Sequence, residues 1–138
     1  MKKYINLVLV IIWMSVIFIM SSFNATESTE QSNTIVLWIC NLLSISNTHI
    51  VTLIVRKLAH FSEYFILGVL LYNLVKSFGK KAIFAVIICI IYAISDEVHQ
   101  CFIPGREGKV IDVLIDTFGG TVGIYLIKTY TYLTKSKK

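Results

Sequence analysis

Long uncharged stretches alternate with short polar segments along this chain. Between Lys3 and Glu27 there is no charged residue, and the run 4–23 contains 20 residues, enough to cross a hydrocarbon core of about 30 Å. Three further apolar stretches follow, at about 53–75, 82–100 and 110–128. The pattern predicts an all-α polytopic membrane protein with four transmembrane helices, organised as a single domain over residues 1–138.

The first stretch has a competing interpretation as a signal peptide, because Lys2 and Lys3 precede it and the small residues Ser21 and Ser22 end it. Its apolar run is longer than the roughly 7–15 residues of a signal-peptide core, so we expect it to be a retained helix. The stretch 82–100 is short, and it spans the membrane only if the helix continues past its two acidic residues.

The connection 24–47 is predicted to be a long loop. Within it Ile35, Trp38, Ile39, Leu42 and Leu43 follow helical spacing, which indicates a short helix lying flat on the membrane.

The composition supports a membrane protein. Of the 138 residues 56% are hydrophobic and 15% are charged, whereas soluble domains average about 25% charged residues. The three cysteines form no CxxC pattern, which argues against a disulfide framework and against a zinc site. No nucleophile elbow, HExxH, P-loop or GxGxxG motif is present, so we expect no cofactor.

The net charge of +5 is explained by topology. With the N-terminus inside, nine basic residues lie on the cytoplasmic side: Lys2, Lys3, Lys76, Lys80, Lys81, Lys128, Lys135, Lys137 and Lys138. The outer side holds the other four basic residues and all eight acidic ones: Arg56, Lys57, Arg106, Lys109, Glu27, Glu30, Glu63, Asp96, Glu97, Glu107, Asp112 and Asp116. The positive-inside rule therefore predicts cytoplasmic N- and C-termini, with membrane lipids rather than nucleic acid as partners.

Ionisable residues at the outer ends of the predicted helices fall on single helix faces. Arg56, His60 and Glu63 share one stripe, and Asp96 shares another with Gln100. Charged groups at membrane depth usually face the interior of a bundle. We therefore expect these stripes to face one another.

The last predicted helix adds a third stripe, formed by Asp112, Asp116, Gly119 and Gly123. The two glycines make a small-residue packing face, so the aspartates on the same face point into the bundle. The three stripes predict a polar cluster at the outer face of the membrane. On the helical wheel Glu97 points away from it.

The loop 102–109 crosses the mouth of this cluster. Pro104-Gly105 is typical of a tight turn, which would direct Arg106 at the site.

Three interpretations of the cluster stay open. Acid–base catalysis or a metal site would use His60, Glu63, Asp96 and Asp112, and the identity of any metal is undetermined. Binding of a polar group would use the cationic and amide side chains, which are Arg56, Lys57, Gln100 and Arg106. The acidic and basic residues would otherwise form only an ion-pair network that fixes the helices.

The order of these residues resembles the VanZ-like family. The resemblance lies in Arg56-Lys57-x-x-His60-Phe61-x-Glu63-Tyr64-x-x-Leu67-Gly68 and in Asp96-Glu97-x-x-Gln100-x-Phe102-x-Pro104-Gly105-Arg106-x5-Asp112-x3-Asp116-x-x-Gly119. It covers about residues 53–127, and its family motif positions are Lys57, His60, Glu63, Asp96, Glu97, Gln100, Pro104, Gly105, Arg106 and Asp112. At the position of Asp116 the family commonly has Asn, which argues against Asp116 as a required ligand.

The resemblance implies a small multi-pass protein of the bacterial cell membrane. The family's founding member is associated with resistance to the glycopeptide antibiotic teicoplanin. Together with the cationic residues at the outer face, the resemblance leads us to expect binding of a polar or anionic group of a lipid-linked wall precursor, lipid or lipoglycopeptide at the outer leaflet. The alternatives are a membrane-embedded hydrolase or transferase acting on lipid-linked envelope substrates through His60 and the carboxylates, and a small transporter.

Overall fold

The computed structural model describes residues 1–135, with the side chains of all but 25–27, 29, 31 and 135, and this part contains helices and no strand. Its helices are α1 (Lys2–Ser21), α2 (Ala25–Leu43), α3 (Thr48–Ser77), α4 (Ala82–Gln100) and α5 (Val110–Lys135). All except α2 are long and apolar enough to cross a membrane. The predicted all-α polytopic class with four spans is confirmed.

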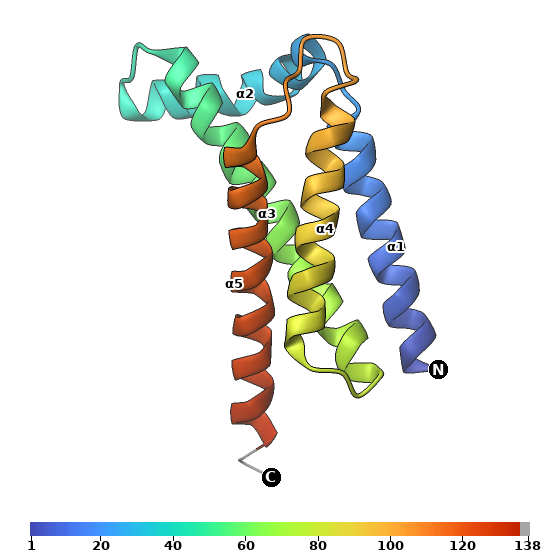
Figure 1. The fold of residues 1–138 in the computed structure, drawn as a ribbon. Helices are drawn as coiled ribbons and strands as arrows, with labels where there is room; N and C mark the ends of the chain where they lie inside the picture. Colours follow the sequence, from blue (N-terminus) through green and yellow to red (C-terminus); the bar gives the residue numbers. More distant parts are fainter. Residues whose placement is uncertain (136–138) are drawn as a thin grey trace.

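Helix α3 is the centre of the bundle and contacts each of the other helices, most extensively α5. The N-terminus and the described end of α5 lie at one end of the bundle, and α2 and the loop 101–109 lie at the other (Figure 1). We call the latter the loop end. Lys137 and Lys138, predicted to be cytoplasmic, lie outside the described residues, as do the side chains of Glu27 and Lys135.

Local signals in the sequence determine where α3 begins and ends. The side chain of Asn47 caps its first turn by accepting a hydrogen bond from the backbone N–H of Ile50 at 3.2 Å. After its last turn Gly79 adopts a φ of 69°, the left-handed conformation that commonly terminates helices. The chain therefore reverses sharply before α4.

The predicted small-residue face of α5 packs directly on the backbone of α3. A Cβ atom added to Gly119 would lie 2.5 Å from the backbone oxygen of Phe61, and one on Gly123 would collide with the backbone oxygen of Phe65. Only glycine allows this approach. The close contact brings the polar residues of α3 and α5 together at the loop end.

Helix α1 is tied to the bundle by hydrogen bonds as well as by apolar packing. The indole N–H of Trp13 donates to the backbone oxygen of Glu63 at 2.9 Å, and the Tyr92 hydroxyl donates to that of Met14 at 2.6 Å. These bonds connect α1 to α3 and α4, so α1 is an integral part of the bundle.

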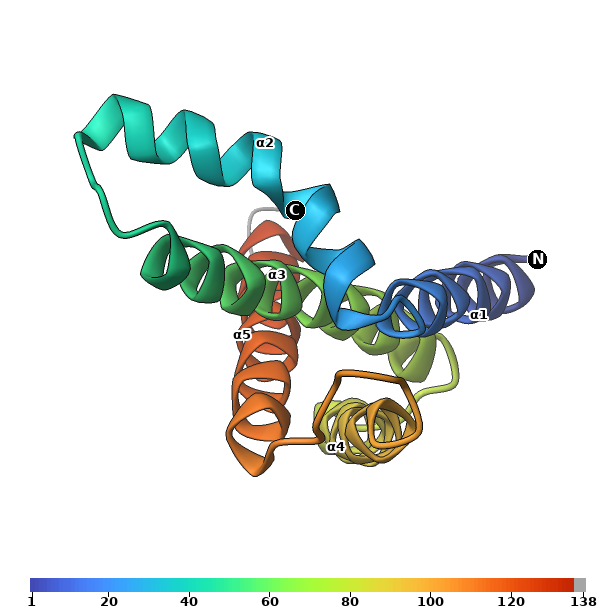
Figure 2. The same ribbon diagram turned by 90° about the horizontal axis from the view of Figure 1, so that it is seen from above.

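The predicted short helix in the connection 24–47 is longer than expected, because α2 begins at Ala25 and includes the polar segment before Ile35. It lies across the loop end (Figures 1 and 2). There Val36 and Cys40 of α2 pack against Val51 of α3. Burial of these side chains holds α2 against the first turns of α3.

Candidate functional site

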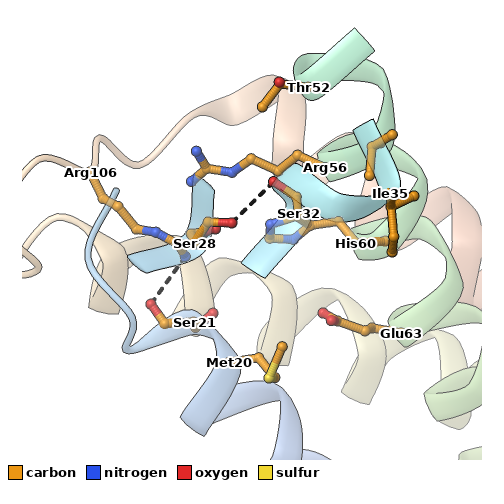
Figure 3. A pocket seen from close by; sticks show the side chains of 12 residues that line it. Met20, Ser21, Ser28, Ser32, Ile35, Thr52, Arg56, His60, Glu63 and Arg106 are labelled. Carbon is orange, nitrogen blue, oxygen red and sulfur yellow. Dashed lines mark hydrogen bonds between the residues drawn. The ribbon is translucent and has the colours of Figure 1, made fainter. Parts of the chain in front are cut away.

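A cavity of about 210 Å³ opens at the loop end between α1, α2, α3 and the loop 101–109 (Figure 3). Its lining combines a few apolar side chains with many polar ones. The polar lining residues are Ser21, Ser28, Ser32, Thr52, Arg56, His60, Glu63 and Arg106. Pockets with convergent polar groups in an apolar setting are the usual form of binding sites.

Arg106 forms one wall of the cavity because a tight turn directs it there, as predicted. Its backbone N–H donates to the oxygen of Ile103 at 3.1 Å, and Gly105 supplies the positive φ of 75° that the turn requires. Its guanidinium donates to the backbone oxygen of Ser21 at 3.1 Å and to the Ser28 hydroxyl at 3.0 Å. These bonds fix the head group of Arg106 in the half-buried wall.

Arg56 reaches the cavity from α3, and its side chain extends toward Arg106 (Figure 3). Among the described side chains, no carboxylate lies within ion-pair distance of Arg56. Burial, and then the nearby charge of Arg56, lower the pKa of Arg106. An arginine stays protonated despite such shifts, so the cavity carries two positive charges that repel each other.

A buried cluster of four potential metal ligands lies next to the cavity: His60 of α3, Asp96 and Glu97 of α4, and Asp116 of α5. One ligand atom from each lies within 4.8 Å of all the others. The three acidic residues are 3%, 4% and 0% exposed, in that order. His60 belongs to both the cavity lining and this group, which we call the carboxylate cluster.

Neutral hydrogen-bond donors surround two of the carboxylates. The Ser21 hydroxyl donates to Asp96 Oδ1 at 2.6 Å. Glu97 accepts from the Gln100 amide at 3.2 Å and from the backbone N–H of Lys109 at 2.8 Å. These donors orient the carboxylates without neutralising their charge.

The third carboxylate has no hydrogen-bond donor. His60 Nδ1 lies 3.5 Å from Asp116 Oδ1, and both oxygens of Asp116 are buried without a hydrogen-bond partner. Asp96 Oδ2 and His60 Nδ1 are also buried and unpartnered. Unpartnered buried polar atoms are costly, by roughly 1–3 kcal/mol each and more when charged.

The structure brings together some of the predicted site residues and separates others. His60, Glu63, Arg56 and Arg106 line the cavity, whereas Asp96 joins His60 in the carboxylate cluster and Gln100 supports it. Lys57 and Asp112 pair with each other, with Nζ and Oδ1 2.5 Å apart, outside both groups.

The expectation that Glu97 points away from the site is wrong. The loop 101–109 folds back over the last turn of α4, so the backbone N–H of Lys109 reaches the Glu97 carboxylate. Gly108 fits there because a Cβ would meet the backbone oxygen of Glu97. A helical wheel shows which face of α4 can contact other helices. It does not show that the loop 101–109 covers a second face of α4, where Glu97 lies.

The ion-pair network is realised only in part. The ion pairs of the described residues are Lys57–Asp112, His60–Asp116 and Lys109–Glu107, the last at 3.8 Å between exposed side chains. Neither Asp96 nor Glu97 has a cationic partner among them. Ion pairs with basic residues therefore do not explain how the charges of the buried carboxylates are balanced.

Sequence reasoning did not identify Ser21 as part of the site and gave little weight to Asp116. Ser21 ends an apolar helix and was considered only as a small residue of a possible signal-peptide cleavage site. In the structure its hydroxyl contacts Asp96. Asp116 is fully buried and belongs to the carboxylate cluster. Its place one turn from Gly119, on the α5 packing face, was the available signal.

Comparison with known proteins identifies one family. The family model described as VanZ/LLP1 matches residues 6–131, which includes most of α1 and α5 and all of the chain between them. No curated protein and no solved structure matches the chain.

Proposed function

We propose that this chain, which belongs to the VanZ/LLP1 family, binds an anionic group of a lipid-linked wall precursor, a lipid or a lipoglycopeptide at the outer leaflet of the bacterial membrane. One observation carries the proposal. Arg56 and Arg106 both line a cavity at the loop end, and Arg56 has no carboxylate partner among the described residues. An anion between them would relieve their repulsion and accept hydrogen bonds from both.

The charges at the opposite end support an outward orientation for the cavity. Lys2, Lys3, Lys76 and Lys80 lie at the end of the bundle that holds the N-terminus. Lysines accumulate on the cytoplasmic side of membrane proteins, and aspartate and glutamate contribute little to orientation. The cavity then opens toward the outer leaflet, where wall precursors and glycopeptides meet.

A binding experiment tests the proposal. Purified protein in neutral detergent is titrated with a polyprenyl-diphosphate-linked peptidoglycan precursor and with short-chain phosphatidylglycerol, and short-chain phosphatidylcholine serves as the zwitterionic control. We expect Arg106→Lys to weaken binding of the anionic ligands by about tenfold or more, because lysine lacks the planar fork of arginine.

Lys109→Gln is the matched control, since the Lys109 side chain is more than half exposed and its ammonium group lies 3.8 Å from the exposed carboxylate of Glu107. Equal affinity of wild-type protein and Arg106→Lys for every anionic probe would refute the proposal. A comparable loss in Lys109→Gln would show that the binding is non-specific charge attraction.

A second candidate function is hydrolysis or group transfer on the bound lipid-linked substrate. The observation that favours it is the position of His60, which borders both the cavity and the carboxylate cluster. An imidazole between a ligand site and carboxylates is suited to move a proton. Turnover of a lipid-linked precursor that is lost in His60→Ala, with unchanged membrane abundance, would support this function. Binding without turnover would exclude it for that substrate.

A further inference from the structure

The carboxylate cluster poses an electrostatic problem that its neighbours do not solve. Asp96, Glu97 and Asp116 are almost completely buried, with one oxygen of each within 4.8 Å of the others. Burying unpaired carboxylates costs several kcal/mol per ion. Among the described residues only His60 offers a positive charge within ion-pair distance of any of them, and it can offer one at most.

No nearby lysine or arginine side chain forms an ion pair with the cluster in the described part of the chain, and Arg56, which has no carboxylate partner, lines the cavity instead. Lys57 pairs with Asp112, and the ammonium group of Lys109 lies beside the exposed Glu107. The Arg106 guanidinium donates to the backbone of Ser21 and to the Ser28 hydroxyl. Arg106 is near enough to interact with Asp96 and Glu97 through space, but none of these cations pairs directly with a cluster carboxylate, which leaves room for a bound cation or protons to balance the charge.

Unpartnered atoms mark where that charge would be placed. Both oxygens of Asp116 and Oδ2 of Asp96 are buried without hydrogen-bond partners, in side chains of residues that are 0% and 3% exposed. Buried polar groups in proteins almost always have a partner, and an ion or water is the usual explanation when no protein group is present. The two residues that carry these unpartnered oxygens belong to the group whose ligand atoms converge.

We propose that His60, Asp96, Glu97 and Asp116 bind one divalent transition-metal ion, Zn²⁺ or Mn²⁺. One imidazole with three carboxylates is a mixed nitrogen and oxygen set, which suits these ions better than Ca²⁺, which takes six to eight oxygen ligands. The four ligands come from α3, α4 and α5, so the metal joins the three helices whose polar ends meet there.

The surrounding donors fit the role of outer-shell groups. Hydroxyl, amide and backbone N–H donors fix the orientation of the ligands around many protein metal sites. Here Ser21 holds Asp96, while Gln100 and the backbone of Lys109 hold Glu97. His60 connects the cluster to the cavity, which gives the metal an entry path from the loop end.

This inference goes beyond anion binding at the arginines and does not depend on it. Purified full-length protein is stripped with chelator and titrated with Zn²⁺ and, separately, with Mn²⁺ by isothermal calorimetry in detergent, and Ca²⁺ is the comparison ion. We expect the wild-type protein to bind Zn²⁺ or Mn²⁺ saturably in a 1:1 ratio. Asp96→Asn and Asp116→Asn should each weaken the affinity for the metal at least tenfold. Asp112→Asn, which removes a carboxylate of the same helix as Asp116 outside the cluster, should change it less than threefold.

A stability measurement keeps the test meaningful if a variant folds poorly. The Asp116→Asn change removes a buried negative charge, so the metal-free variant should unfold at a higher temperature than the metal-free wild type. Added metal should raise the unfolding temperature of the variant less than that of the wild type. Two results would overturn the proposal: no 1:1 binding of either ion by wild type, or an equal loss of affinity in Asp112→Asn.

Discussion

The close contact between α3 and α5 decides whether replacing a glycine of α5 by alanine stabilises or destabilises the protein. In a helix without neighbours, Gly→Ala is stabilising by roughly 1 kcal/mol. At Gly119 the new Cβ would lie 2.5 Å from the backbone oxygen of Phe61, against the about 3.5–4 Å of an ordinary contact. The helices must move apart by about 1 Å, and overpacking of this kind typically costs about 1–3 kcal/mol.

After the propensity gain is subtracted, we expect Gly119→Ala to reduce the free energy of unfolding by up to about 2 kcal/mol. The assay is denaturant titration of the detergent-solubilised protein followed by circular dichroism. The control is Leu114→Phe, which adds volume on the same helix at a side chain that is 58% exposed. Because Phe61 follows His60, the same shift should also weaken metal binding. Stability equal to or above that of wild type would refute the packing argument.

Four further variants test the contacts of α1 and the partly exposed ion pair between Lys57 and Asp112 by the same titration. Ser21→Ala should cost about 1.5–3 kcal/mol because buried Asp96 loses its donor, and Ser22→Ala, whose hydroxyl is exposed, should cost less than about 0.5 kcal/mol. Trp13→Phe should cost about 0.5–1.5 kcal/mol because it loses one hydrogen bond to α3. Lys57→Met should change stability by less than about 1 kcal/mol, since its ion pair is partly exposed. A larger effect of Lys57→Met than of Ser21→Ala would contradict this ranking.

The transmembrane helices were predictable because hydrophobic runs of sufficient length have one stable arrangement in a bilayer. The start of α4 at Ala82 and its end at Gln100 agree with the sequence pattern. The length of α2 did not follow from that pattern, because its polar first half has no apolar stripe. Its helical conformation is instead supported by its place across the loop end, with Val36 buried against α3.

The candidate site was predictable as a set of helix faces but not as a set of contacts. Helical periodicity placed His60 and Asp96 toward the bundle interior, and both lie in the carboxylate cluster. Periodicity carries no information on how the loop 101–109 folds, so it misplaced Glu97. It also does not reveal which residue of another helix lies opposite, which is why the pairing of Lys57 with Asp112 was not foreseen.

The length of α3 determines how a ligand reaches the arginines. Its 30 residues extend about 45 Å, about 15 Å more than the hydrocarbon core of a bilayer. If Lys76 marks one boundary of the core, the opposite boundary lies 20 residues away, at Arg56, and His60 lies only about 6 Å deeper. Under the proposed function, a lipid diffusing within its own leaflet would carry its phosphate at the height of Arg56, so it could enter sideways without being lifted out of the bilayer.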